Sequence, residues 1–368
     1  MRNKALFFCT LITSCVFVAC KSTPPPRVEP PPAKTEGILC VPPANDTNAP
    51  VNIRNVVGKL GSIERLDAAL DQLLDKDLSI QKLAEGFDWS EGPVWMGDHL
   101  LFSDVPMNTV FKWSERDGIS IFLQPSGYNG KLPRGGEPGS NGLTRDKEGR
   151  LILCQHGNRQ IARREKDGKI VTIANQYRSR RFNSPNDAVV KSNGDIYFTD
   201  PPYGLPGNMN DRTKELPFQG VYRWSANDKR VTLLTSEMSR PNGLAFSPDE
   251  KILYVANSDP TNAVWMAFPV NADGTLGKGR VFFDATSMRS GKKGLPDGLK
   301  VDARGNLWAT GPGGVMIISP EAKHLGTLAT GEATANCAWG DDGSTLYITA
   351  DMYLCRVRTK VKGAGWQP

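Results

Sequence analysis

The repeat that organises this chain is clearest in residues 240–257, which read RPNGLAFSPDEKILYVAN. Asn242 and a glycine introduce one apolar run, a polar turn follows, and a second apolar run begins at Leu253. Two short apolar runs separated by a turn are typical of a β-hairpin. An asparagine at the entry to such a hairpin is the feature that recurs elsewhere in the chain.

The same pattern occurs six times after residue 85. Each copy starts with a glutamate, an asparagine or an aspartate, namely Glu91, Asn141, Asn186, Asn242, Asp297 and Asn336. The intervals between them are 50, 45, 56, 55 and 39 residues, a range expected when each repeat forms one four-stranded blade. No repeat has the periodicity of a long amphipathic helix, which disfavours a βαβ architecture. We therefore predict an all-β fold, a six-bladed β-propeller over residues 78–368.

The N-terminal segment has the pattern of a secretory signal peptide over residues 1–20, with two basic residues before an apolar run that ends at Cys20. The run is shorter than the roughly 20 residues that cross a bilayer. Phe17-Val-Ala-Cys20 resembles a bacterial lipobox, which predicts that Cys20 carries a lipid. We expect an exported lipoprotein, tethered to the periplasmic side of the outer membrane; a periplasmic or secreted protein without the lipid is the alternative.

Two further elements are expected before the propeller. Residues 21–60 are rich in proline and predict an extended, semi-rigid linker. Ser62 is a suitable N-cap for a helix over residues 61–77, whose apolar face would pack on the rim of the propeller. The segment Ile80–Leu83 is expected to supply a strand that closes the ring against the last blade.

Charge and cysteine content limit the possible partners. The formal charge of +6 falls to +4 when the leader, with its two basic residues, is removed, which is too small an excess to indicate nucleic acid. Nothing in the sequence implies a protein partner.

Four cysteines follow the lipid site, namely Cys40, Cys154, Cys337 and Cys355. An exported protein could pair them; Cys337 with Cys355 is the best candidate, and two free buried thiols are the alternative.

The six leading residues of the repeats predict a metal site. The innermost strand of each blade lines the axial channel, so residues at equivalent positions form a ring, and here all six carry side-chain oxygen atoms. The alternative is that they only cap turns, as Asn and Asp often do. Two carboxylates with several amides suit Ca²⁺ best, while Mg²⁺, Mn²⁺ and Zn²⁺ remain alternatives.

A divalent ion at the floor of a channel favours hydrolysis, because it polarises a carbonyl or phosphoryl oxygen and a nearby carboxylate can act as general base. Other hydrolytic and phosphate-binding motifs are missing from the sequence. There is no Gly-x-Ser-x-Gly elbow and no phosphate-binding glycine loop, and the chain has only 3 histidines.

Five motifs in order resemble the gluconolactonase branch of the SMP-30/gluconolactonase/LRE-like family. They are Glu91-Gly-Pro-Val-Trp, Phe182-Asn-Ser-Pro-Asn186-Asp-Ala-Val-Val, Tyr197-Phe-Thr-Asp-Pro-Pro-Tyr-Gly204, Arg240-Pro-Asn242-Gly-Leu-Ala-Phe and Leu295-Pro-Asp297-Gly-Leu. The resemblance spans about residues 78–360. It implies that Glu91, Asn186, Asn242 and Asp297 bind one catalytic divalent ion. It also implies that Asp297 acts as general base or nucleophile.

Two more residues are candidates for contact with the substrate. Asn141 belongs to the ring but not to the implied ligand set, and His156 stands at the end of a predicted strand near the channel mouth. Ser184 stands where animal members of the family carry an arginine, so Arg181 is the arginine that could reach the same space.

The expected reaction is hydrolysis of a sugar lactone, with glucono-1,5-lactone as the first candidate substrate. Two other functions fit the same ring of oxygen atoms. One is hydrolysis of other lactones or of phosphotriesters, and the other is a non-enzymatic surface propeller whose ion is structural. Acidic residues at both Glu91 and Asp297 favour the enzymatic functions, since water and apolar side chains can fill a structural channel.

Overall fold

The computed structural model describes residues 38–41, 51–132 and 134–366, all within the compact unit Ala33–Pro368. The predicted signal peptide, Cys20 and most of the predicted linker lie outside the described residues. Within the described part, no helix has the length and apolar character needed to span a membrane.

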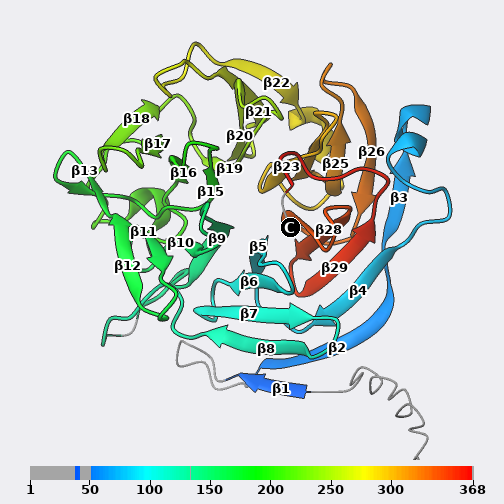
Figure 1. The fold of residues 1–368 in the computed structure, drawn as a ribbon, viewed down its shortest axis with the longest axis horizontal. Coiled ribbons are helices and arrows are strands. Elements are labelled where there is room, and N and C mark those ends of the chain that lie inside the picture. The colour runs from blue at the N-terminus through cyan, green and yellow to red at the C-terminus, as the bar shows by residue number, and fades with distance from the viewer. Residues whose placement is uncertain (1–37, 42–50, 133, 367–368) are drawn as a thin grey trace, which may run out of the picture. The chain divides into compact units, whose positions relative to one another are not determined.

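Six antiparallel sheets follow one another around a central axis, which confirms the predicted six-bladed propeller (Figure 1). Blade 1 contains β5 (Ser90–Trp95), β6 (Leu100–Asp104), β7 (Thr109–Ser114) and β8 (Gly118–Leu123). Blade 2 contains β9 (Ser140–Arg145), β10 (Leu151–Gln155), β11 (Gln160–Arg164) and β12 (Ile170–Ala174). Blade 3 contains β15 (Ala188–Val190), β16 (Ile196–Asp200), β17 (Gly220–Trp224) and β18 (Val231–Thr235). The short pair β13 (Gln176–Tyr177) and β14 (Arg180–Arg181) lies between blades 2 and 3 in sequence.

The remaining three blades complete the ring. Blade 4 contains β19 (Pro241–Phe246), β20 (Ile252–Asp259), β21 (Asn262–Pro269) and β22 (Arg280–Asp284). Blade 5 contains β23 (Leu299–Val301), β24 (Leu307–Gly311), β25 (Gly314–Ile318) and β26 (His324–Ala329). Blade 6 contains β27 (Thr334–Gly340), β28 (Thr345–Ala350) and β29 (Tyr353–Arg358) from the C-terminal end of the chain.

A strand from the N-terminal side closes the ring. β4 (Ile80–Glu85) pairs with β29, with Tyr353 opposite Glu85 and Arg356 opposite Gln81, so the predicted closing strand is confirmed. β2 (Val51–Leu60) and β1 (Ile38–Val41) extend this sheet outward. The last blade therefore joins strands from both ends of the described chain.

The predicted helix over residues 61–77 is wrong. Ser62–Arg65 form strand β3, which pairs with β26 at the edge of blade 5 and places Ile63 opposite Leu328. Only the short 3₁₀ helix η1 (Ala68–Gln72) follows. The physical reason is the open edge of β26, whose unpaired backbone groups take up an extended segment more readily than a short isolated helix would form. Likewise, residues 51–60 belong to a strand rather than to the predicted linker.

The apolar residues that suggested a helix are nevertheless buried. Leu70, Leu73 and Leu74 pack in the cluster of apolar side chains that blades 5 and 6 share. Asp67 caps η1, its Oδ1 accepting the Ala69 N–H at 2.8 Å. The expectation that this segment docks on the propeller is confirmed, although its conformation differs.

Glycines explain how closely the inner strands approach one another. In four of the six repeats, glycine follows the leading residue, and a Cβ atom there would collide with the next blade. The nearest atom would be Asn141 O at 2.1 Å from Gly92, Asn186 O at 2.6 Å from Gly142, Asp297 O at 2.3 Å from Gly243 and Asn336 Cγ at 2.0 Å from Gly298. The small residue in the repeat is therefore a packing requirement of the axis.

The candidate disulfide between Cys337 and Cys355 is wrong. Both residues lie opposite Ile348, Cys337 on β27 and Cys355 on β29, so a whole strand separates them. Two strand spacings amount to about 10 Å, whereas bridged cysteines have Cα atoms within about 7 Å. Both thiols are free and buried, as is that of Cys154, while the side chain of Cys40 lies outside the described part of the structure.

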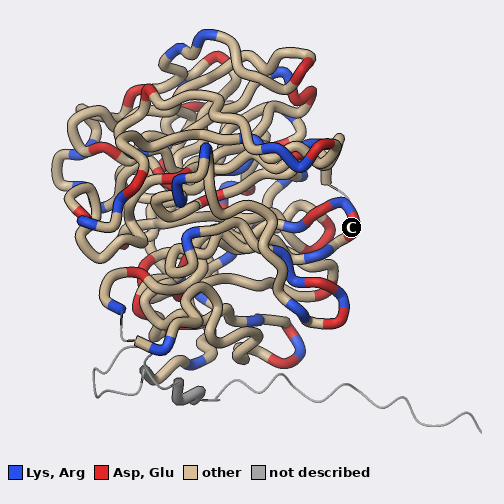
Figure 2. The backbone as a smooth tube through the Cα atoms, turned by 90° about the vertical axis from the view of Figure 1, so that its left-hand side faces the viewer, with Lys and Arg blue, Asp and Glu red and all other residues tan. Residues whose placement is uncertain are grey.

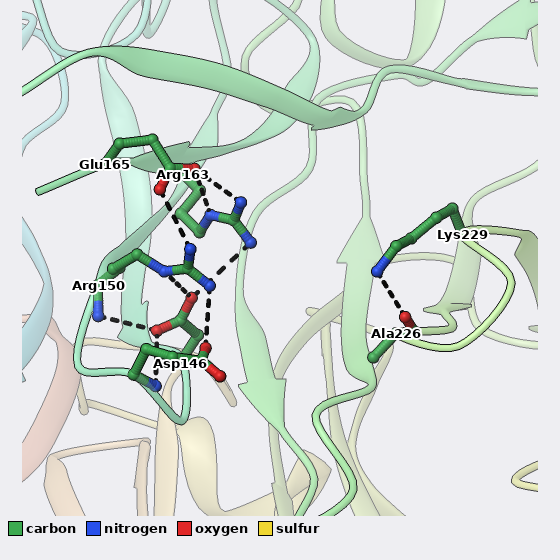
Figure 3. Close-up of polar contacts among 7 residues, drawn as sticks. Asp146, Arg150, Arg163, Glu165, Ala226 and Lys229 are labelled. Atoms are coloured by element: carbon green, nitrogen blue, oxygen red, sulfur yellow. Dashed lines mark hydrogen bonds and ion pairs between the residues drawn. The ribbon is translucent and has the colours of Figure 1, made fainter.

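The hairpin turns are held by local polar contacts. In the turn between β9 and β10, Asp146 Oδ1 accepts the Arg150 N–H at 2.8 Å, and Arg150 Nε lies 2.7 Å from Asp146 Oδ2 (Figure 3). Arg150 and Arg163 also reach Glu165 (Figure 3). Figure 2 shows basic and acidic residues interspersed along the chain on the face in view. Such surface pairs stabilise a fold by only about 0–1 kcal/mol each.

A buried aspartate ties a loop to the end of β16. The two carboxylate oxygens of Asp200 accept the N–H groups of Asn183 and Ser184, each at 2.8 Å. Burial nevertheless dominates and raises the pKa of Asp200 from 3.8 to about 7. Asp104 occupies the equivalent position in blade 1, where burial also raises its pKa to about 7. The folded protein therefore retains protons that the unfolded chain releases.

We predict that Asp200→Asn changes the pH dependence of stability. Because the pKa of Asp200 in the folded protein exceeds its ordinary value, this group's contribution to stability falls as the pH rises from about 4 to about 7. Asparagine cannot ionise, so the variant gains stability relative to the parent protein across that window. Urea unfolding at several pH values measures the difference, with the exposed Asp77→Asn as control. A difference that stays constant with pH would contradict the assignment.

Candidate active site

The entry ends of the inner strands surround a cavity of about 430 Å³. Five of the six leading residues line it, and they come from blades 1 to 5, namely Glu91, Asn141, Asn186, Asn242 and Asp297. A second cavity of similar size, about 450 Å³, lies beside β2 and β4 and contains none of these residues. The predicted ring is thus gathered at one place, which makes the first cavity the candidate site.

Three oxygen atoms in this ring lack hydrogen-bond partners. Among the described residues, Asn141 Oδ1, Asn186 Oδ1 and Asp297 Oδ1 are buried and accept no hydrogen bond. An unsatisfied buried acceptor costs about 1–3 kcal/mol. Three of them on the wall of one cavity therefore indicate that a ligand with positive charge or hydrogen-bond donors belongs there.

The carboxyl groups in the cavity are electrostatically strained. Burial and, to a smaller extent, the nearby Asp187 charge together raise the pKa of Glu91 to about 8. Burial and then the charge of Glu91 raise the pKa of Asp297 well above its ordinary range. A cation between the two groups would favour their ionised forms and remove this strain.

The donor set fits a hard divalent cation. Within the described residues, no group of three or more His, Cys, Asp and Glu side chains could hold a metal ion. The predicted ligands instead combine two carboxylates, Glu91 and Asp297, with the amides Asn186 and Asn242. An all-oxygen set of this kind suits Ca²⁺ or Mg²⁺ and does not suit Zn²⁺, which prefers nitrogen and sulfur.

Asn336, the sixth member of the ring, points elsewhere. Its Nδ2 donates to Glu91 Oε2 at 3.2 Å and to Asp187 Oδ2 at 3.4 Å, while its Oδ1 accepts the Cys337 N–H at 2.9 Å. Lys300 Nζ lies 3.5 Å from the same Oδ1 and lowers the pKa of Asp187, which burial raises. Asn336 therefore holds Glu91 in place and does not line the cavity.

Asp187 is a functional neighbour that the sequence reasoning missed. It follows Asn186 at the position where four other repeats have glycine, and this break in the pattern was the available signal. A carboxylate there reaches the axis and meets Asn336 and Lys300.

His156 lies behind the ring. Its Nε2 is 3.4 Å from Asn186 Nδ2 and its Nδ1 is 3.1 Å from Glu137 Oε2, and the side chain is fully buried. The imidazole is thus placed to orient Asn186, whereas Glu137 itself lines the cavity. A direct contact between His156 and the substrate stays a prediction.

Neither Ser184 nor Arg181 lines the cavity. Ser184 Oγ donates to Pro201 O at 2.6 Å and accepts the Gly204 N–H at 2.9 Å, so it fixes the loop after β16. Arg181 donates to Asn158 O at 3.1 Å. The space between the ring and solvent is bounded instead by residues that were not among the predicted site residues, namely Trp89, Glu137, Tyr203, Arg240, Ser258, Arg289 and Lys292.

Comparison with known proteins points to one family. Residues 89–351 match the family model described as SMP-30/Gluconolactonase/LRE-like region. The gluconolactonase of Zymomonas mobilis is 40% identical over 314 residues, which cover 83% of this chain and 88% of that protein. Regucalcin of Bos taurus is 27% identical, covering 73% of this chain and 84% of that protein. The solved structure of a Xanthomonas campestris gluconolactonase matches with a TM-score of 0.72 and 30% identity, covering 82% of this chain and 97% of that one.

We predict that Asn336→Ala destabilises the protein. The change leaves the Glu91 and Asp187 carboxylates without a shared donor in a buried place, which costs about 1–3 kcal/mol. The free energy of unfolding from chemical denaturation measures the loss. The exposed Asn227→Ala is the matched control, and a loss no larger than that of the control would contradict the bridging role of Asn336.

Proposed function

The chain belongs to the SMP-30/gluconolactonase/LRE-like family and is a lactonase, and from this we propose that it hydrolyses glucono-1,5-lactone to gluconate with the help of a divalent cation, most simply Ca²⁺. One observation carries the proposal: buried oxygen atoms of Asn141, Asn186 and Asp297 face one cavity without partners. Glu91, Asn186, Asn242 and Asp297 would hold the ion.

The reaction needs a nucleophile, a polarised carbonyl and a base. When bound, a divalent ion at these residues supplies Lewis acidity for the carbonyl. Asp297 is the residue that we assign as base, because one of its carboxylate oxygens is free within the cavity. The water oxygen bonds to the lactone carbonyl carbon, Asp297 takes the proton, the ring carbon–oxygen bond breaks, and that proton passes to the departing ring oxygen.

The remaining residues would position the sugar. Asn141 presents its unpartnered Oδ1 to the cavity and can accept a hydrogen bond from a substrate hydroxyl. Tyr203 and Ser258 also line the cavity and carry hydroxyl groups. His156 supports Asn186 from behind. Such positioning raises the rate because the reacting atoms are held close to their reactive geometry.

The first test is acid release from glucono-1,5-lactone by protein that starts at residue 21. We predict turnover with Ca²⁺, loss of turnover with chelator and a loss of about 10²- to 10⁴-fold in Asp297→Asn, since the variant lacks the base. The exposed Asp249→Asn, at a hairpin turn, is the control. No turnover by folded, cation-loaded protein would reject this substrate and direct the search to other lactones and to phosphotriesters.

Cation binding can be followed without turnover in the same experiment. A ligand that binds only the folded state raises the melting temperature, so Ca²⁺ should raise Tm in the parent protein. The rise should be smaller in Asn186→Ala, which removes a ligand oxygen. Equal shifts in both proteins would place the ion elsewhere.

Export and lipid attachment through Cys20 form a separate proposal that rests on the sequence of the leader. We predict that the full chain expressed in a Gram-negative host partitions with membranes, and that Cys20→Ala moves it to the soluble periplasmic fraction. Fractionation and immunoblotting measure the distribution. Equal membrane association of both forms would reject lipidation at Cys20.

A further inference from the structure

The candidate cavity has one basic wall. Arg240 directly precedes β19, Arg289 ends the 3₁₀ helix η3 (Thr286–Arg289), and Lys292 follows it, so all three residues come from blade 4 and its connection to blade 5. All three line the cavity together with the predicted cation ligands. The acidic loop residue Glu137 comes from the connection between blades 1 and 2. The cavity is therefore asymmetric in charge.

These positive charges have little local compensation. Among the described residues, neither Arg240 nor Arg289 forms an ion pair, although the Asp259 carboxylate lies near enough to Arg240 to interact with its charge. Arg289 donates instead to the backbone carbonyl of Pro260. Lys292 lies 3.8 Å from Glu64 Oε2, at the outer limit of an ion pair.

The acids of the cavity are engaged elsewhere. Glu137 lies 3.1 Å from His156, and Glu91 and Asp297 belong to the proposed cation site. With a divalent cation bound there, Glu137 is the one remaining acid among the described residues that line the cavity, against the three basic side chains. The basic wall then faces the substrate with a net positive charge.

A second observation at the same wall points to a ligand. The hydroxyl of Tyr203 is buried and makes no close hydrogen bond among the described residues, with the Ser258 hydroxyl as a neighbour, and Tyr203 lines the cavity together with Ser258 and Arg240. A buried hydroxyl that lacks a close acceptor is unfavourable, and a bound acceptor would satisfy it. Two guanidinium groups, an ammonium group and this hydroxyl form a donor set suited to an oxyanion.

We propose that the preferred substrate is a sugar lactone with an anionic substituent, a phosphate, sulfonate or carboxylate, bound by Arg240, Arg289 and Lys292. This inference rests on the proposed lactonase function and specifies its substrate class. The lactone carbonyl lies toward Glu91 and Asp297, and the anionic group lies toward blades 4 and 5. A neutral polyol would leave the basic wall without a counter-charge.

The test compares two lactones that differ only in the anionic group. Glucono-1,5-lactone and 6-phosphoglucono-1,5-lactone are assayed with the same cation-loaded protein. We expect kcat/KM to be about 10- to 100-fold higher for the phosphorylated lactone, the range given by one or two hydrogen bonds between charged groups. Glucaro-1,5-lactone, which carries a free carboxylate at C6 in place of the phosphate ester, distinguishes which oxyanion is preferred.

Variants assign the preference to the basic wall. Arg240→Gln and Arg289→Gln should each reduce the ratio of kcat/KM for the phosphorylated lactone to that for the neutral one by about 10-fold. Lys278→Gln removes the same charge at an exposed position and is the matched control. Added salt should raise KM for the anionic lactone more than for the neutral one, because screening weakens only the charged contact.

Binding of the products gives a readout without turnover. Calorimetry should find tighter binding of 6-phosphogluconate than of gluconate, and Arg289→Gln should reduce the difference. If the neutral lactone is hydrolysed at least as efficiently as the phosphorylated and carboxylated ones, the substrate class is wrong and the lactonase assignment stands. If no lactone is hydrolysed by folded, cation-loaded protein, the proposed substrate and this inference fall together.

Discussion

The close approach of neighbouring inner strands is the constraint on which the rest of the structure depends. It requires glycine beside the leading residues, because a Cβ at Gly92 would lie 2.1 Å from Asn141 O and one at Gly243 would lie 2.3 Å from Asp297 O. With no side chain between them, the inner strands of adjacent blades nearly touch. Five of the six leading side chains then line the cavity at the axis. The close packing of the inner strands therefore also brings the oxygen atoms of the leading residues together.

Gathering acids on an axis carries an electrostatic cost. Burial and the charge of neighbouring carboxyl groups together raise the pKa of Glu91 to about 8 and that of Asp297 well above its usual range. The chain offsets part of this cost with its own groups, since Asn336 donates to Glu91 and Lys300 stabilises the charge on Asp187. A bound ligand would have to offset the electrostatic cost that remains. Proteins commonly retain such strain at functional sites, where local stability is exchanged for affinity.

The sequence predicted those parts of the structure that repeat along the chain. Six hairpins, their leading oxygen donors and the closing strand at Ile80–Glu85 were predictable because they repeat or complete a repeat. The segment after Ser62 was mispredicted because its partner, the edge of β26, lies about 260 residues further along the sequence. No local sequence pattern indicates this pairing. Tyr203 and Arg289 were not predictable for a related reason: they lie on connections, which have no repeat and whose path is set by tertiary contacts.

Asp187 shows how one departure from the repeat organises the site. Blade 3 has a carboxylate where blades 1, 2, 4 and 5 have glycine, and Asn336 from blade 6 reaches across to it at 3.4 Å. The same amide also donates to Glu91 of blade 1 at 3.2 Å, so a single side chain connects three blades beneath the cavity. A carboxylate held from below has fewer accessible rotamers, and a pre-oriented ligand binds a cation with less loss of entropy. Asp187, the residue that departs from the repeat, therefore helps to order the side chains of the ring.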